Sequence, residues 1–432
     1  MKPSVGSLLL AWCWCIAGGL VAVAQPPIES LSGGFKRFQQ GRLTLITDLP
    51  IDDELRSWPE VLDQAIAIWT DRWRVDPAQS QAWRLTAYLI GDRKRFMESG
   101  LAPQVPPFED GYQLRDTVFL IEQPSIYYRR HLFLHEATHW AMYRGFGGAG
   151  SPWFMEGMAD LYGTHRWSDR KLALGILPSS PGEVPQWGRF KRLHAMLARD
   201  DIPSLRQILN YTNESGDRMD RYVWSWAACV FFMNHPHYKD AFAAASEPPL
   251  DYSMSLSQKL SASLEPRWPW VVAEWNGFLS DFDFGYVPAR SMPRLDENAF
   301  QLMNTNSHEC DIDAARGWQG TGIRVRRGET LRLTAEGKYQ VGVGANGKPW
   351  VSEPPGITIR YVSHQPLGRL LATIVPGPEA EATRRWEPMA IGRGGGLTSE
   401  TDGFLLLKVN DAAGELGDNQ GVLRVRIQKS GP

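Results

Sequence analysis

The pattern of apolar and polar positions divides the chain into a front part with strands and helices and a back part with strands alone. Apolar and polar residues alternate from Arg42 to Thr47, and apolar residues recur at helical spacing from Trp58 to Trp73, which predicts a strand and then a helix. Two more strands are predicted at Leu85–Ile90 and Thr117–Ile121, with a short helix at Arg93–Ser99 between them. Longer helices are predicted at Ile126–Tyr143, Pro152–Tyr162, Met219–Met233 and Trp268–Phe284.

The segment from Val287 to Asp296 has no periodicity and contains two prolines, so we expect a change of domain there. Beyond Trp318 only short β-patterned runs follow, separated by turns rich in glycine and proline, which indicates an antiparallel sandwich or barrel. The runs are Ile323–Arg326, Leu331–Ala335, Ile357–Val362, Leu370–Val375, Phe404–Val409 and Val422–Ile427. The predicted fold class is α+β, with an α+β domain over residues 25–290, a linker over 291–316 and a β-sandwich domain over 317–432.

The N-terminal segment has the features of an export signal. Lys2 precedes an apolar run from Leu8 to Ala24, and the small residues Ala22 and Ala24 stand where a signal peptidase cuts. This pattern predicts a signal peptide over residues 1–24 and a mature chain that is secreted or periplasmic and makes no membrane contact after cleavage. A retained membrane anchor is the alternative, against which the helix-breaking pair at Gly18 and Gly19 argues.

Charge and cysteine content narrow the classes of partner. The 46 lysines and arginines nearly balance the 48 aspartates and glutamates, and no basic stripe is present, so we expect no nucleic-acid partner. Of the four cysteines, Cys13 and Cys15 lie in the predicted signal peptide. Cys229 and Cys310 remain, and their pairing depends on whether the fold brings them within bonding distance.

The segment from His135 to His139 has the H-E-x-x-H pattern. Because a helix turns once in about 3.6 residues, its two histidines project from one face and can chelate one ion, for which zinc is suited. Glu156 on the next predicted helix supplies a carboxylate, and such a set leaves a coordination position open for water, as catalytic zinc sites do. Asp160, one turn after Glu156, could accept the other ring N–H of a ligand histidine.

Together with the segment W-F-M-E-G-M-A-D that contains Glu156, this motif resembles the gluzincin metallopeptidases, specifically their short peptidase-MA-like domains. The resemblance implies a zincin-like fold, Zn²⁺ as the cofactor, and a peptide or protein substrate. It makes Glu136 the general base, which takes a proton from water and passes it to the leaving amine. It also implies that Gly111–Ile121 lies along the cleft edge and pairs with an extended peptide. Tyr222 is our candidate donor to the oxyanion, with a packed core tyrosine as the alternative.

In the back part, oxygen-bearing side chains gather in one short loop between Asn410 and Gly421. Hard oxygen donors at this density suit Ca²⁺, and a solvated acidic loop is the alternative. The segment from about Trp318 to Ile427 resembles the galactose-binding, calcium-dependent bacterial lectins, which implies glycan recognition. The family's calcium ligands correspond to Asp411, Glu415, Asp418 and Asn419, although Glu415 and Asp418 stand where neutral side chains are usual.

The function predicted from the sequence is therefore an exported zinc-dependent metallopeptidase with an accessory β-sandwich. The alternative is an exported carbohydrate- or surface-binding protein whose zinc domain is catalytically weak. A purely structural zinc ion would ordinarily need four protein ligands, commonly cysteines, and no cysteine lies near the motif. The sequence leaves open the substrate, endopeptidase against exopeptidase action, latency and the oligomeric state.

Overall fold

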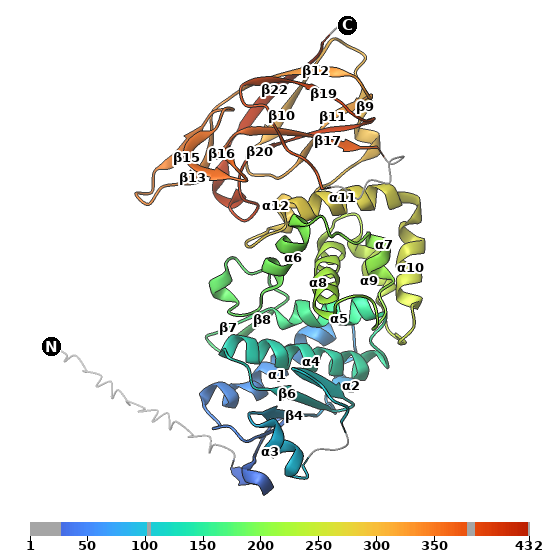
Figure 1. Cartoon of the computed structure of the whole chain (residues 1–432), viewed down its shortest axis with the longest axis vertical. Coiled ribbons are helices and arrows are strands. Elements are labelled where there is room, and N and C mark those ends of the chain that lie inside the picture. Colours follow the sequence, from blue (N-terminus) through green and yellow to red (C-terminus); the bar gives the residue numbers. More distant parts are fainter. Residues whose placement is uncertain (1–26, 102–104, 378–384, 431–432) are drawn as a thin grey trace, which may run out of the picture.

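The computed structural model describes residues 27–101, 105–377 and 385–430, so the predicted signal peptide lies outside the described residues. Along the long axis of the molecule, a sheet at one end is followed by a helical middle and by a β-rich part at the other end (Figure 1). This mixture of helices and several sheets agrees with the predicted α+β class. In the described part of the chain, no helix combines the length and apolar character needed to cross a bilayer.

The first sheet has six strands in the order β1-β2-β3-β4-β6-β5. Strands β3, β4 and β6 run parallel, and each of the others is antiparallel to its neighbour. The bounds are β1 (Ile28–Ser30), β2 (Lys36–Gln40), β3 (Leu43–Thr47), β4 (Leu85–Ile90), β5 (Gly111–Leu114) and β6 (Thr117–Ile121). The predicted cleft-edge segment Gly111–Ile121 is therefore a hairpin and not one strand. Its first half, β5, forms the sheet edge, because the turn at Arg115 and Asp116 folds β6 back inside.

Two long helices pack on this sheet in one apolar cluster. Helix α1 (Asp53–Arg72) is capped by Asp52, whose carboxylate accepts the Leu55 N–H at 2.9 Å, and it buries Trp58 and Trp69. Helix α4 (Ile126–Phe146) is capped by Ser125 at its N-terminus and by Gly147 at its C-terminus, where φ is 76°. Both helices lie between the sheet and the helical middle (Figure 1).

The helical middle is organised by α5 (Pro152–Gly163) and α8 (Arg218–Asn234). A Cβ added to Gly157 would lie 2.4 Å from the Ser225 carbonyl oxygen and 2.6 Å from Cys229 Sγ, so the helices touch closely there. Other helices of the described chain are α2 (Pro77–Ser80), α3 (Arg93–Glu98), α6 (Arg189–Ala198), α7 (Leu205–Leu209), α9 (Lys239–Ala245), α10 (Ser255–Leu264), α11 (Trp268–Asp281) and α12 (Pro288–Ser291), with the hairpin β7 (His165–Ser168) and β8 (Lys171–Leu174). Of these, only α3 and α11 were predicted.

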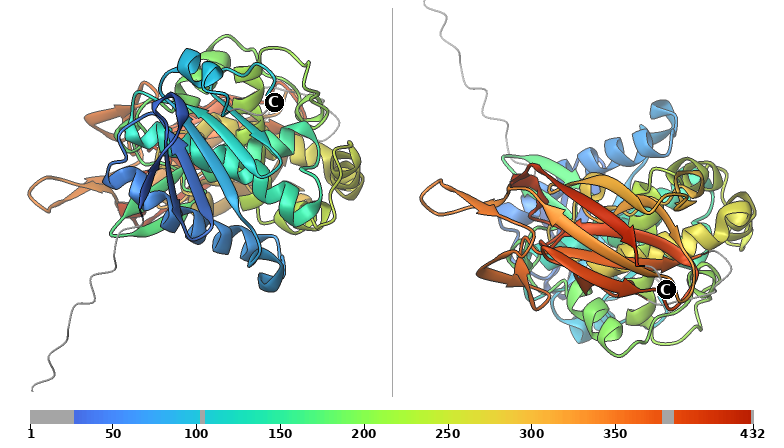
Figure 2. Two further views of the ribbon diagram at one scale, coloured as in Figure 1. Left: turned by 90° about the horizontal axis from the view of Figure 1, so that it is seen from below. Right: turned by 90° about the horizontal axis from the view of Figure 1, so that it is seen from above.

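The C-terminal part holds two sheets, ordered β10-β22-β12-β19 and β18-β17-β20-β11-β9, that share one apolar cluster. All neighbouring strands are antiparallel except β9 and β11. Their bounds are β9 (Gln301–Leu302), β10 (Ser307–Asp313), β11 (Gln319–Val325), β12 (Thr330–Glu336), β17 (Leu370–Pro376), β18 (Met389–Ala390), β19 (Gly394–Thr398), β20 (Gly403–Val409) and β22 (Val422–Lys429). Two smaller sheets, visible from above (Figure 2), contain β13 (Tyr339–Val343), β14 (Pro349–Ser352), β15 (Ile357–Val362), β16 (Gln365–Leu367) and β21 (Asn419–Gln420).

The predicted linker over residues 291–316 is only partly irregular. Its segment β10 pairs with β22 from Ser307 to Asp313, so the β-rich part begins before residue 317. The domain boundaries themselves stay a prediction. Cys229 is buried on α8, and Cys310 lies on β10. Both thiols are free, so the two cysteines, whose pairing the sequence left open, do not form a disulfide.

The helical middle and the β-rich part are in contact through paired groups. Lys408 Nζ lies 2.7 Å from Asp281 Oδ1, and both side chains are largely buried. Ser291 Oγ donates a hydrogen bond of 3.1 Å to the Ala413 carbonyl oxygen. These contacts join the end of α11 and the chain after it to strand β20 and the loop that follows.

Candidate metal centre

The two histidines of the H-E-x-x-H motif lie one turn apart on α4. Their Nε2 atoms are 3.2 Å apart, and both side chains are largely shielded from solvent. This closeness follows from the helix period, because positions four residues apart share a face. Two imidazole nitrogens thus point at one place.

Helix α5 brings Glu156 to the same place. Its Oε2 atom lies 3.3 Å from His135 Nε2 and 3.5 Å from His139 Nε2. Glu156 Oε2 is buried and has no hydrogen-bond partner. The three side chains form a group whose donor atoms could hold a metal ion.

The spacing of these donor atoms can be compared with that around a zinc ion. Ligand atoms about 2.0–2.1 Å from zinc at tetrahedral corners lie about 3.3–3.4 Å from one another. The observed separations are 3.2, 3.3 and 3.5 Å. The unpartnered carboxylate oxygen and the three separations therefore both fit a cation bound between the side chains.

A second group of metal-type side chains shows the opposite situation. His235, His237 and Glu274 lie close together, but His235 Nε2 donates to the Pro293 carbonyl at 2.9 Å and its Nδ1 accepts from a backbone N–H at 3.2 Å. Glu274 accepts from the Leu295 N–H at 2.6 Å and from the hydroxyl of Tyr238. Because these polar groups already have protein partners, the cluster holds the chain after α12 in place and does not fit a metal ion.

The protonation states of His135, His139 and Glu156 depend on one another. Burial alone would raise the pKa of the Glu156 carboxyl, but the charge of His139 and the contact with both imidazoles lower it. Burial would lower the pKa of His135, yet the carboxylates of Asp160, Glu156 and Glu136 raise it. Without a metal, the fold therefore favours a protonated imidazole beside an ionised carboxylate, and a divalent cation would replace that proton.

Asp160, the predicted partner of a ligand histidine, lies next to His135 on the side away from Glu156. Its carboxylate is fully buried, and Oδ1 lies 3.5 Å from His135 Nδ1 and 3.4 Å from His131 Nε2. Arg189, at the start of α6, donates to both carboxylate oxygens at 2.7 and 2.9 Å. Neither Arg189 nor His131 was predicted as a site residue. A signal existed for His131, which is one turn before His135 on the same helix face.

Glu136 points from α4 toward the sheet edge. A Cβ added to Gly111, the first residue of β5, would lie 2.5 Å from Glu136 Oε1, so the carboxylate rests against the strand backbone. Burial raises the pKa of the Glu136 carboxyl, while the positive charges of His139 and His135 lower it. The net pKa is raised, which brings Glu136 closer to the range in which a carboxylate accepts and returns protons near neutral pH. The sequence predicted Gly111 as the start of the cleft-edge segment but not its contact with Glu136.

Tyr222 approaches the site from the first turn of α8. Its ring centroid lies 6.0 Å from that of His135, and the guanidinium of Arg218 lies 5.8 Å from the tyrosine ring. Burial and the nearby carboxylates of Glu156 and Glu136 raise its pKa well above the usual value, so the hydroxyl stays protonated. Arg218 also reaches Glu109, just before β5, at 2.6 Å. Tyr222 is thus near the predicted ligands and able to donate.

The predicted calcium ligands are only partly together. The guanidinium of Arg360 lies 3.0 Å from Asp411 Oδ1 and also contacts the Glu415 carboxylate. Asn419 Nδ2 donates to Asp411 Oδ2 at 3.0 Å, while Asn419 Oδ1 is buried without a partner. The Asp418 side chain is exposed. In this arrangement the Arg360 guanidinium occupies the space between the two carboxylates, so the residues as placed do not fit a calcium ion, and calcium binding would require Arg360 to move.

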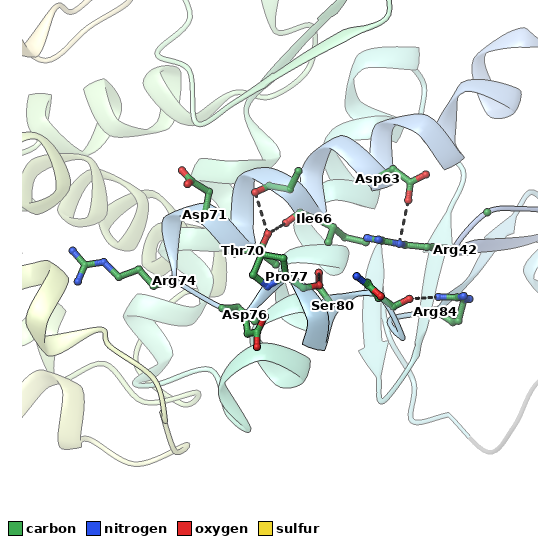
Figure 3. A pocket seen from close by; sticks show the side chains of 14 residues that line it. Arg42, Asp63, Ile66, Thr70, Asp71, Arg74, Asp76, Pro77, Ser80 and Arg84 are labelled. Atoms are coloured by element: carbon green, nitrogen blue, oxygen red, sulfur yellow. Dashed lines mark hydrogen bonds and ion pairs between the residues drawn. The ribbon is translucent and has the colours of Figure 1, made fainter.

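A separate pocket is lined by residues between Gly41 and Arg84, which precede the motif helices in the sequence. It has a volume of about 1040 Å³ and lies beside α1 and α2, with Arg42 and Asp63 paired at its rim and Arg74 and Arg84 nearby (Figure 3). None of the predicted site residues lines it, and its charged groups are of both signs. The metal-type donors and this pocket are therefore separate features.

Comparison with known proteins found solved structures that resemble parts of this chain. No protein-family model matches the chain, and no curated protein matches it. One similar solved structure is the EclA N-terminal domain, a PllA-like lectin, with 19% identity over 29% of this chain and 98% of that chain and a TM-score of 0.23. Another is IMPa from Pseudomonas aeruginosa in complex with an O-glycopeptide, with 11% identity and a TM-score of 0.17. The second likeness covers 64% of this chain and 27% of that chain. Neither likeness indicates what this chain binds.

Proposed function

We propose that this protein is an exported zinc-dependent peptidase of the gluzincin type, with a zincin-like N-terminal domain and a C-terminal β-sandwich. The observation that carries the proposal is the convergence of His135 Nε2, His139 Nε2 and Glu156 Oε2, with separations of 3.2–3.5 Å and a buried carboxylate oxygen that has no hydrogen-bond partner. Two imidazoles and one carboxylate are the donor set of open zinc sites in peptidases.

Zinc bound by these three side chains would supply a Lewis acid that polarises a carbonyl and acidifies water. Glu136 stands beside the first ligand and is the proposed general base, because it is buried and its pKa is raised. It accepts the proton of the attacking water and delivers it to the leaving amine. The buried position keeps solvent from competing for that proton.

Two further elements complete the proposed chemistry. The protonated Tyr222 hydroxyl would donate a hydrogen bond to the oxygen of the attacked carbonyl as negative charge develops there. Strand β5 is the edge of the six-stranded sheet, so its free backbone groups can pair with an extended peptide beside Glu136. Backbone pairing of this kind would orient the scissile bond without specifying a side chain.

Metal analysis combined with digestion of a peptide library tests the proposal. We expect the full-length mature protein to contain one equivalent of zinc and to cleave peptides, with cleavage lost in a chelator and restored by zinc. Mass spectrometry of the products would also separate endopeptidase from exopeptidase action. Zinc-loaded protein that cleaves no peptide of the library, at any pH from 5 to 9, would instead favour the alternative of a binding protein with a catalytically weak site.

A second proposed function, glycan binding, rests on a pocket in the C-terminal part. This pocket has a volume of about 430 Å³ and combines the ring of Trp350 with the charged groups of Arg360, Glu415 and Asp418. An aromatic face beside hydrogen-bonding side chains suits a sugar ring. Calorimetry with galactosides, in calcium and in chelator, distinguishes calcium-dependent binding, metal-independent binding held by Arg360, and no binding.

A further inference from the structure

Asp160 is a buried anion with an unusual number of donors around it. Arg189 Nε donates to Oδ2 at 2.7 Å and Arg189 Nη2 donates to Oδ1 at 2.9 Å, while two imidazole nitrogens approach Oδ1 at 3.4 and 3.5 Å. Asp160 is 0% exposed and Arg189 is 5% exposed. Solvent therefore contributes little to the stability of the carboxylate, and the protein groups must provide it.

The guanidinium acts on the carboxylate in two ways. Its positive charge compensates the buried carboxylate, which would otherwise be costly to keep ionised. Its two parallel N–H groups bind both oxygens at once, and such a fork fixes the plane of the carboxylate. Oδ1 is thereby held toward His135 Nδ1. With the carboxylate held in this direction, His135 Nδ1 faces Oδ1, and Nε2 is left free as the ligand atom.

The surrounding backbone is shaped for this arrangement. A Cβ added to Gly163, at the end of α5, would lie 2.7 Å from the ring of His131, which packs between that glycine and Asp160. Arg189 begins α6 directly after Gly188, whose φ of 68° is readily adopted by glycine. Two segments far apart in sequence thus close around one carboxylate.

We propose that Arg189 is a positioning residue of the metal site, which sets metal affinity by holding the Asp160 carboxylate in the direction of His135. The inference rests on the proposed zinc site. It concerns no contact with substrate, because Arg189 reaches the ligand only through Asp160. Removing the direct partner of a ligand histidine typically changes metal affinity by about 10- to 100-fold, and Arg189 holds such a partner, Asp160.

The test is the zinc affinity of full-length variants, measured by competition with a chromogenic chelator. We expect Arg189→Met to weaken zinc binding by about 10- to 100-fold and Arg189→Lys, which keeps the charge but loses the fork, to weaken it less. Arg192→Met is the matched control, since Arg192 is one turn further on α6 and pairs with Asp217 and Asp220 at the surface. The control should bind zinc like the parent protein.

A double-mutant cycle shows whether Arg189 acts through Asp160. We expect Asp160→Asn to weaken zinc binding. Adding Arg189→Met to this variant should cause no further loss of zinc affinity. The absorption spectrum of cobalt bound to the site should change in Arg189→Lys and not in the control. This comparison also serves if Arg189→Met fails to fold, because the lysine variant and the double variant leave no uncompensated buried carboxylate.

Parental zinc affinity and an unchanged cobalt spectrum in folded Arg189 variants would overturn the inference, as would fully additive effects in the cycle. Absence of zinc binding by the parent protein is a different result, since it would remove the proposed function itself. Because affinity is measured without substrate, the two failures are distinguishable.

Discussion

Gly111 offers a direct test of where the catalytic carboxylate lies. A methyl group at this position would lie 2.5 Å from Glu136 Oε1, 2.9 Å from Glu136 Cγ and 2.9 Å from Leu132 Cδ1. The contact with Oε1 is about 0.9 Å shorter than an ordinary contact of 3.4 Å. Glu136 belongs to the long packed helix α4, and its side chain is 6% exposed, so its carboxylate has little room to move aside without leaving its place.

The size of the effect follows from that displacement. Misplacing a reacting group by about 1 Å costs about 100-fold in rate, which corresponds to about 2.7 kcal/mol of transition-state stabilisation. We therefore expect Gly111→Ala to lower kcat by about 100-fold while KM changes little. Zinc content should stay at the parental level, because the substitution touches none of the three proposed ligands.

The assay is steady-state cleavage of the best peptide from the library, with zinc content measured on the same sample. Gly182→Ala is the matched control, since the nearest atom to its added methyl group lies 3.7 Å away. If the edge strand moved in place of the carboxylate, KM would rise and kcat would be kept. That result, or a parental kcat with zinc retained, would refute the placement of Glu136 against β5.

Four other outcomes are expected. Glu136→Gln should reduce kcat by about 10²- to 10⁴-fold in the cleavage assay and keep its zinc by metal analysis, since only the base is lost. Glu156→Gln should lose zinc at neutral pH, which metal analysis after dialysis would show. Gly157→Ala should lower the free energy of unfolding by about 1–3 kcal/mol in thermal denaturation, because its methyl group would meet the Ser225 carbonyl at 2.4 Å. Burial lowers the pKa of His235 to about 4, so its contribution to stability, complete above about pH 6.5, should be lost as pH falls toward 4. The Tm of His235→Gln should then depend less on pH over that range than the parental Tm.

Much of the fold could be predicted because its signals are local. Strands β4, β6 and β15 have the bounds that the alternation of apolar residues predicts, and α4 and α5 end within three residues of their predicted ends. The helices α6, α7, α9 and α10 were not predicted, because they are short and much of their stability comes from burial among other helices. Strand β10 was assigned to a linker, because its pairing with β22 joins segments more than a hundred residues apart and leaves no local trace.

In the candidate site, too, some features could be predicted from local sequence and others depended on packing. The chain by itself determined that His135 and His139 share a face and that Glu136 lies between them in sequence, because the helix period fixes the directions of neighbouring side chains. The approach of Glu156 was a hypothesis from motif spacing, and the packing of α5 in the helical middle decided its distance from both imidazoles.

Only the tertiary structure decided what surrounds these side chains. Arg189 on Asp160, Gly111 beneath Glu136 and Arg360 between Asp411 and Glu415 are contacts between segments distant in sequence. No periodic pattern marks such partners, since each contact depends on how whole elements pack and on which buried charge must be compensated. Residues that touch the proposed ligands were thus partly readable from the sequence, and residues that position or neutralise them were not.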